Sequence, residues 1–125
     1  MAHILIVEDE PHTARLLEVR MGQVGHTTAW VKDGNAALGA ARELMPDLIL
    51  LDFMLPGISG IEVVKKLKRD PATRRIPVIM LTANSEGESV LAGLDAGADA
   101  YVIKPVHFPD LVRRIAHFLG RNVTV

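Results

Sequence analysis

Short apolar runs alternate with helix-like segments along the whole chain, and this regular order constrains the fold more than any other feature. Strong runs rich in leucine and β-branched residues lie at 4–7, 48–51, 78–81 and 101–103, with a weaker one at 27–31. Each run is too short for an ordinary helix. Elsewhere apolar residues recur at spacings of three and four, which indicates helices around 16–21, 37–44, 61–67, 90–94 and 111–119.

Turn and capping residues mark the boundaries of these helices. Glycine and proline are expected to end the five helices, at Gly25, Pro46, Pro71, Gly97 and Gly120. Three side chains that suit an N-cap precede helical segments, namely Asp33, Ser59 and Ser85. Five repeats of strand and helix, with strands apolar on both faces, predict a parallel sheet covered by helices on each side. Five strands are too few for an eight-stranded barrel, so we predict a single-domain α/β fold, the flavodoxin-like (βα)5 doubly wound parallel sheet with strand order 2-1-3-4-5.

The composition fits one compact domain over residues 1–125. Hydrophobic residues make up 49% of the chain, and with no repeat or linker in the sequence we expect no second domain and favour a stand-alone protein. Lys and Arg number 14 and Asp and Glu 15, so the net charge of −1 gives no overall attraction to nucleic acid or anionic lipid. The lack of cysteine, of a leader-like N-terminus and of a long apolar segment favours a cytoplasmic protein that does not span a membrane.

Acidic residues follow two strands that are neighbours in the predicted order. In an open parallel sheet, the ligand crevice lies outside the carboxyl ends of the strands where the strand order reverses, here between the first and third strands. Glu8 and Asp9 follow the first of these strands, and Asp52 follows the third. Two carboxylates about 4 Å apart repel by roughly 1 kcal/mol in water and about 4 kcal/mol at an effective dielectric constant of 20. A positive charge is therefore expected among them.

Two positive groups are candidates for this edge. Lys104 follows the fifth strand, but one ammonium cannot balance three carboxylates. A divalent cation would balance the remaining negative charge. Mg²⁺ is favoured because it binds one or two carboxylates together with water and phosphate oxygens. Thr82 follows the fourth strand and adds a hydroxyl donor. Together these residues predict a phosphoryl-transfer site with Asp52 as the nucleophile and with Thr82 and Lys104 stabilising the transferred group.

Several blocks of the sequence, in order, resemble one known family. The segments ILIVEDE, PDLILLDFMLPGISG, PVIMLTA and GADAYVIKP are similar to those of the CheY-like receiver domains of two-component response regulators. The resemblance extends from residue 4 to about residue 119. It implies a phosphoacceptor switch of a two-component phosphorelay, in which Asp52 takes a phosphoryl group from a phosphohistidine on a sensor kinase or phosphotransfer protein.

The resemblance also assigns residues to the cation and the phosphoryl group. It implies that Asp9 and Asp52 bind Mg²⁺, with Mn²⁺ as an alternative, that Glu8 acts through water, and that the backbone carbonyl of Met54 is a further ligand. It implies that Lys104 pairs with the phosphoryl oxygens and that the Lys104–Pro105 peptide bond is cis. Beyond transfer to its own aspartate and loss of that phosphate, the domain would not act as an enzyme.

A switch is implied as well. Thr82 would move toward the phosphate and Tyr101 would turn inward, which changes the face formed by the fourth helix, the fifth strand and the fifth helix and so controls an unidentified protein target. Gly87 and Gly93 make the fourth helix easy to shift. Met54 and Asn84 occupy positions that tune dephosphorylation, and because a methionine side chain cannot orient a water by donating a hydrogen bond, we expect a long-lived phosphorylated state.

Some positions depart from the family pattern. Regulators of the winged-helix transcription branch resemble one another in a basic residue on the fourth helix and in a second acid after GAD. Here the fourth helix has no Lys or Arg, and Ala100 follows GAD. We therefore expect a monomer or a weak phosphorylation-dependent dimer, with no direct binding of nucleic acid by this domain.

Three alternatives compete with this interpretation. A receiver-like docking module without phosphorylation would need no complete acidic set. A dehalogenase-like Mg²⁺ phosphatase would need a second Asp two residues after the nucleophile, where Met54 stands. A flavin or nucleotide domain would need a phosphate cradle after the first strand, where the sequence is EDEPH.

Overall fold

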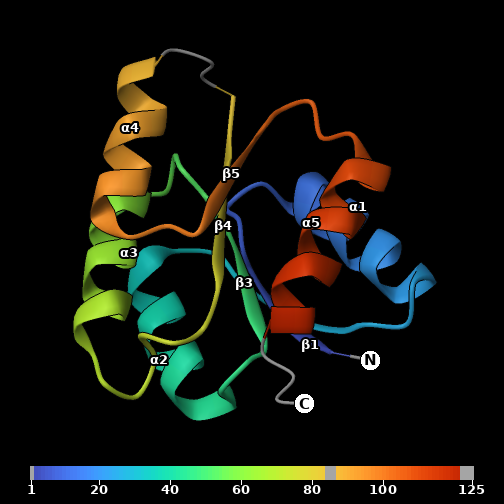
Figure 1. Cartoon of the computed structure of the whole chain (residues 1–125), viewed down its shortest axis with the longest axis horizontal. Coiled ribbons are helices and arrows are strands. Elements are labelled where there is room, and N and C mark those ends of the chain that lie inside the picture. The colour runs from blue at the N-terminus through green and yellow to red at the C-terminus, as the bar shows by residue number, and fades with distance from the viewer. Residues whose placement is uncertain (1, 84–86, 122–125) are drawn as a thin grey trace.

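The computed structural model describes residues 2–83 and 87–121, which form one five-stranded parallel sheet flanked by five helices (Figure 1). The strand order β2-β1-β3-β4-β5 confirms the predicted doubly wound fold. The strands are β1 (His3–Val7), β2 (Thr27–Val31), β3 (Leu48–Asp52), β4 (Val78–Thr82) and β5 (Ala100–Ile103). The helices are α1 (Pro11–Gln23), α2 (Gly34–Leu44), α3 (Gly60–Arg69), α4 (Gly87–Ala96) and α5 (Phe108–Arg121).

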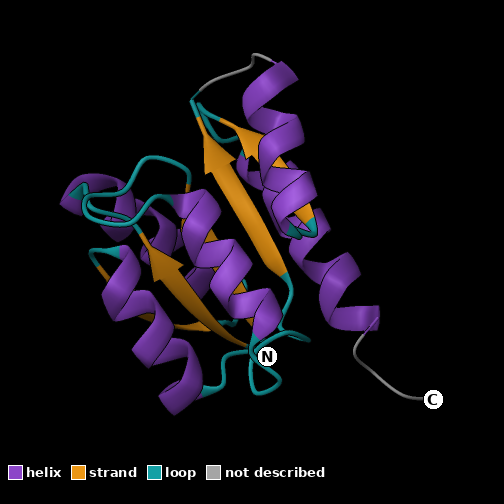
Figure 2. Cartoon of the chain, turned by 90° about the vertical axis from the view of Figure 1, so that its left-hand side faces the viewer, coloured by secondary structure: helices purple, strands orange, loops and turns teal. Residues whose placement is uncertain are grey.

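The sheet separates two hydrophobic layers. Helices α1 and α5 cover one face, and α2, α3 and α4 cover the other (Figures 1 and 2). Successive residues of β1 point to opposite faces, so that Ile4 and Ile6 join the first layer while Leu5 and Val7 join the second. Burial on both faces explains why the central strands are continuous apolar runs. Of the helices in the described residues, none is long and apolar enough to cross a membrane.

The helix starts follow their capping residues. Asp33 Oδ1 accepts from the N–H of Ala36 at 2.8 Å, and Ser59 Oγ accepts from that of Glu62 at 3.2 Å, which confirms both predicted caps. The cap predicted at Ser85 lies outside the described residues. Helix α1 begins after Glu10, whose carboxylate accepts from backbone N–H groups of the first turn; we did not predict this cap. Such caps stabilise a helix by about 1 kcal/mol.

Four of the five predicted helix ends are confirmed. Gly25 and Gly97 follow α1 and α4 in the left-handed region, with φ of 90° and 115°, where glycine avoids a steric cost. Prolines follow soon after α2 and α3. The prediction for Gly120 is wrong, because α5 continues through it to Arg121. Gly120 is exposed, so it costs the helix about 1 kcal/mol at most, while the buried Phe118 just before it anchors the last turn.

One lysine ties three elements together at the amino-terminal edge of the sheet. Lys68, near the end of α3, donates through Nζ to the carbonyls of Arg74 at 3.2 Å and Ile76 at 2.9 Å. The same Nζ lies 2.9 Å from Asp99 Oδ2, which also accepts from the N–H of Val78 at 2.8 Å. The contact therefore fixes the starts of β4 and β5 against α3.

Replacement of this lysine should destabilise the fold. Lys68→Met removes the donor from two carbonyls and a carboxylate, and we expect the free energy of unfolding to fall by about 1–3 kcal/mol in urea denaturation. Lys65→Met is the matched control, since Lys65 lies on the same helix and makes only a 3.9 Å exposed contact with Glu62 among the described ion pairs. Equal stability losses in the two variants would contradict the assigned role.

Candidate functional site

The carboxyl ends of four strands bring the predicted site residues to one edge of the sheet. Asp52 is the last residue of β3 and Thr82 the last of β4, while Glu8 directly follows β1 and Lys104 directly follows β5. The register pairs Val7 with Leu51, so the chain after β1 emerges beside the end of β3. Parallel pairing therefore turns four positions distant in sequence into one cluster.

Three carboxylates converge in this cluster. One oxygen from each of Glu8, Asp9 and Asp52 lies within 4.8 Å of the others. Glu8 is 1% exposed and Asp52 6% exposed, whereas Asp9 faces solvent. Two of the three charges are thus buried, where their mutual repulsion is stronger than in water.

Lys104 provides the positive charge that the described residues bring to the carboxylates. Its Nζ lies 3.2 Å from Glu8 Oε1 and 3.4 Å from Asp52 Oδ1, and its backbone N–H donates to the carbonyl of Thr82 at 2.7 Å. The N–H of Met54 donates to Asp52 Oδ1 at 3.3 Å. Within the described part of the chain, no group donates a hydrogen bond to the buried Oε2 of Glu8 when Glu8 and Asp52 are both ionised. One ammonium therefore leaves the cluster under-compensated.

The electrostatics of Glu8 reflect this imbalance. Burial raises the pKa of its carboxyl to about 8, with further contributions from hydrogen bonding with Asp52 and from the charge of Asp52, while Lys104 opposes the shift. A proton on Glu8 is one way to relieve the repulsion, and a metal ion is another. Three carboxylates with an unpartnered buried oxygen are hard donors that fit a divalent cation such as Mg²⁺.

The remaining predicted residues lie around this cluster. Thr82 is buried, and Tyr101 is half-buried with its ring against the layer under α2 and α3. The Lys104–Pro105 peptide bond is cis. The side chain of Met54 is 70% exposed and points away from the core, whereas Asn84 lies outside the described residues. The catalytic, switch and tuning roles given to these residues stay predictions.

Two residues near the site were not predicted from the sequence. Trp30 in β2 donates through its indole Nε1 to the backbone carbonyl of Glu8 at 2.7 Å. Gly60 opens α3, and a Cβ there would lie 2.8 Å from the carbonyl oxygen of Asp52 and 2.9 Å from that of Phe53. Only glycine lets the helix start approach the acidic strand end so closely. The role of Gly60 could have been predicted from its position directly after the Ser59 cap. The Trp30 contact could not, because it depends on the register between β1 and β2.

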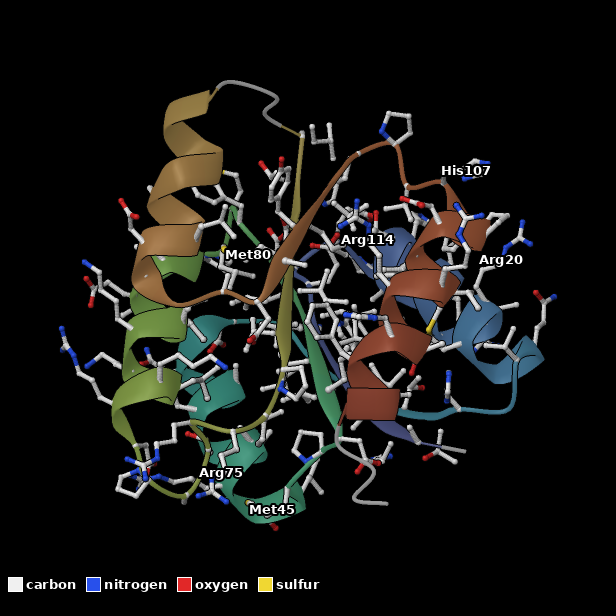
Figure 3. All side chains as sticks on the ribbon, in the orientation of Figure 1. Arg20, Met45, Arg75, Met80, His107 and Arg114 are labelled. Atoms are coloured by element: carbon white, nitrogen blue, oxygen red, sulfur yellow. The ribbon has the colours of Figure 1, made fainter. Side chains whose placement is uncertain are left out.

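Helix α4 packs closely on the strand that carries Thr82. Met80 of β4 lies between the sheet and α4 (Figure 3), and a Cβ on Gly93 would come within 2.9 Å of its sulfur. Met80 also pairs with Tyr101 across β4 and β5. Contact therefore runs from the strand ending at Thr82 to both α4 and Tyr101.

The protonation of Glu8 predicts how stability depends on pH. The folded protein retains a proton that the unfolded chain releases near its ordinary pKa of 4.5. Without divalent cations, the free energy of unfolding should therefore fall as the pH rises toward about 8. Urea denaturation in EDTA at about pH 7.5 and about pH 8.5 measures this fall above the range in which His26 titrates, because its pKa is 6.5 in the unfolded chain and burial lowers it in the folded protein. Glu8→Gln should show little change over the same interval, and an equal fall in this variant would exclude Glu8 as the cause.

Comparison with known sequences assigns the chain a clear set of relatives. A family model of the response regulator receiver domain matches residues 4–116. The DNA-binding response regulator MtrA of Mycolicibacterium smegmatis is 45% identical over 119 residues, which cover 95% of this chain and 51% of MtrA. The phosphate regulon transcriptional regulatory protein PhoB of Escherichia coli is 45% identical over 118 residues, which cover 94% of this chain and 52% of PhoB. The chain thus spans about half the length of these relatives.

Solved structures share the fold over nearly their full length. The receiver domain of the sensor histidine kinase PA1611 from Pseudomonas aeruginosa, solved with magnesium in its active-site cleft, is 31% identical with a TM-score of 0.89. That match covers 95% of this chain and 98% of the other. The receiver domain of the Francisella response regulator 1452 is 28% identical with a TM-score of 0.91, and the match covers 98% and 100% of the two chains.

Proposed function

The chain belongs to the response regulator receiver domain family, and we propose that it is the phosphoacceptor switch of a two-component phosphorelay. The observation that carries the proposal is the convergence of Asp52 with two further acids and Lys104 at one sheet edge. A docking module without phosphorylation has no need for so costly a cluster of charge. A dehalogenase-like phosphatase is disfavoured because the exposed Met54 stands where that reaction needs a second Asp.

Asp52 is the residue that forms the covalent bond. One of its carboxylate oxygens attacks the phosphorus of a phosphohistidine on a sensor kinase or phosphotransfer protein; a P–O bond forms, the P–N bond breaks, and the histidine nitrogen takes up a proton. Lys104, 3.4 Å from Asp52 Oδ1, is placed to pair with the transferred phosphoryl oxygens. The domain transfers the group to itself and loses it by hydrolysis, so it does not turn over a substrate as an enzyme does.

The acidic cluster is proposed to bind Mg²⁺, or Mn²⁺ in its place. Asp9 and Asp52 would hold it directly, Glu8 through water, and Met54 through its backbone carbonyl. When bound, the ion neutralises charge on the phosphoryl oxygens during transfer. The support is the donor set itself and the magnesium in the related PA1611 receiver domain. The charge of the bound ion would also offset the repulsion between Glu8 and Asp52.

Phosphorylation would then change the face formed by α4, β5 and α5. The new group adds about −1.5 to −2 charges at Asp52, and the Thr82 hydroxyl moves toward its oxygens while Tyr101 turns further inward. Met80 of β4, the strand that ends at Thr82, packs closely against Gly93 of α4. The downstream target is a protein that reads this face, and nucleic acid is not expected to bind this domain directly, although MtrA is named a DNA-binding regulator.

We propose a monomer or a weak phosphorylation-dependent dimer. On α5, Arg113 and Arg114 lie 2.8 Å and 3.3 Å from the carboxylate of Asp110 on the same helix, and Figure 3 labels Arg114. Ala100 at the start of β5 offers no charge to a partner. These charges are therefore already paired within one protomer, which weakens the case for a salt-bridged dimer.

The first test is phosphorylation by a small phosphodonor. With Mg²⁺ and acetyl phosphate, mass spectrometry should show a single phosphoryl addition, because one carboxylate is held for attack. Asp52→Asn should show none, and Asp47→Asn, at an exposed acid of the opposite edge, is the matched control and should behave as wild type. Turnover of many donor molecules would indicate a phosphatase instead, and a complete lack of addition would favour the docking module.

The lifetime of the phosphorylated state is the second test. The exposed Met54 side chain cannot orient an attacking water, so Met54→Asn should speed phosphate loss by about three- to tenfold, the size expected for one added hydrogen bond. The decay of the phosphorylated protein after donor removal measures the rate. Met54→Leu is the control and should decay like wild type. An unchanged rate in Met54→Asn would count against the tuning role.

A further inference from the structure

The chain's single tryptophan, Trp30, contacts the backbone of the acidic pair. Its indole Nε1 donates to the carbonyl of Glu8 at 2.7 Å, which is short for an N–H···O hydrogen bond. The ring is half-buried and packs against the hydrophobic layer under α1 and α5. The Lys32 ammonium lies 5.5 Å from the ring centroid. A hydrogen bond, the core and a cation therefore hold the indole in one place.

This contact forms where the pairing of β1 and β2 ends. Val7 pairs with Val31, and the N–H of Glu8 still donates to the carbonyl of Val31 at 3.1 Å. A further rung of the parallel ladder would bring the N–H of Asp33 to the carbonyl of Glu8. The chain has turned at Asp33, however, to begin α2. The side chain of Trp30 supplies the donor at the point where strand β2 ends.

Fixing this carbonyl also fixes the acids on either side of it. The carbonyl of Glu8 and the N–H of Asp9 belong to one rigid peptide plane, so a donor that orients the carbonyl orients the plane. The Cα atoms that carry both carboxylates lie at the ends of that plane. Since the carboxylates of Glu8, Asp9 and Asp52 lie within 4.8 Å of one another and repel, the peptide needs such a restraint.

We propose that Trp30 is a positioning residue for the cation site, holding the Glu8–Asp9 peptide in the orientation that divalent cations need. The tryptophan does not touch the ion. It acts through the backbone, by keeping two ligands in place before the ion arrives, which lowers the cost of binding. This inference rests on the proposed function, because it assumes that the acidic cluster binds Mg²⁺.

The test removes the indole donor and measures Mg²⁺ affinity by calorimetry, with no phosphodonor present. Trp30→Phe keeps an aromatic ring without the N–H, and replacement of Trp30 by benzothienylalanine keeps the shape of the indole while sulfur replaces the N–H. Both should bind Mg²⁺ about three- to tenfold more weakly, the size expected for one lost hydrogen bond. In wild type, the single indole N–H resonance should shift on Mg²⁺ titration with the calorimetric midpoint.

Controls separate positioning from stability. Ile115→Val removes a methyl group from the same hydrophobic layer, at a buried position of α5, and should leave Mg²⁺ affinity unchanged while lowering stability. Wild-type affinity in the benzothienylalanine protein, or an equal loss of affinity in Ile115→Val, would overturn the role of Trp30. A wild-type protein that fails to bind Mg²⁺ would overturn the proposed function itself and the inference with it.

Discussion

Three carboxylates that repel one another are held within 4.8 Å at the end of the sheet, and the surrounding fold has to keep them there. The sheet is buried on both faces, so its strands cannot shift to separate Glu8 from Asp52 without breaking two hydrophobic layers. The acids stay together because packing elsewhere holds their backbones. Lys104 offsets part of the repulsion, while burial and, after it, contact with Asp52 raise the pKa of Glu8 to about 8. Holding these carboxylates together therefore lowers the stability of the fold.

The fold and the composition of the site followed from patterns that are local in sequence. Apolar runs of three to five residues and helical spacings predicted the elements, and the general rule for parallel sheets placed Asp52, Thr82 and Lys104 at one edge. Contacts that depend on side-chain direction and register were not accessible in this way. Glu10 as a cap and Trp30 as a donor to Glu8 are examples, as is the continuation of α5 through Gly120.

The predicted softness of the fourth helix takes a different form in the structure. Its glycine content predicted a helix of low intrinsic stability. Gly93 also has a packing role, because it lets α4 approach Met80 closely. The methionine side chain has several rotatable bonds, so Met80 can change its conformation and still contact α4. The same methionine pairs with Tyr101. The contact between β4 and α4 is therefore adaptable at the point where the switch would act.

The Lys68 contact gives the two ends of the sheet different mechanical properties. At the amino-terminal edge, Nζ of Lys68 and the carboxylate of Asp99 join α3, β4 and β5 into one rigid corner. At the opposite edge, Lys104 contacts Glu8 and Asp52, two buried carboxylates that repel each other. A rearrangement that begins beside Asp52 would then act like a hinge whose pivot is that corner, with a larger displacement at the carboxyl ends of β4 and β5 than at their starts.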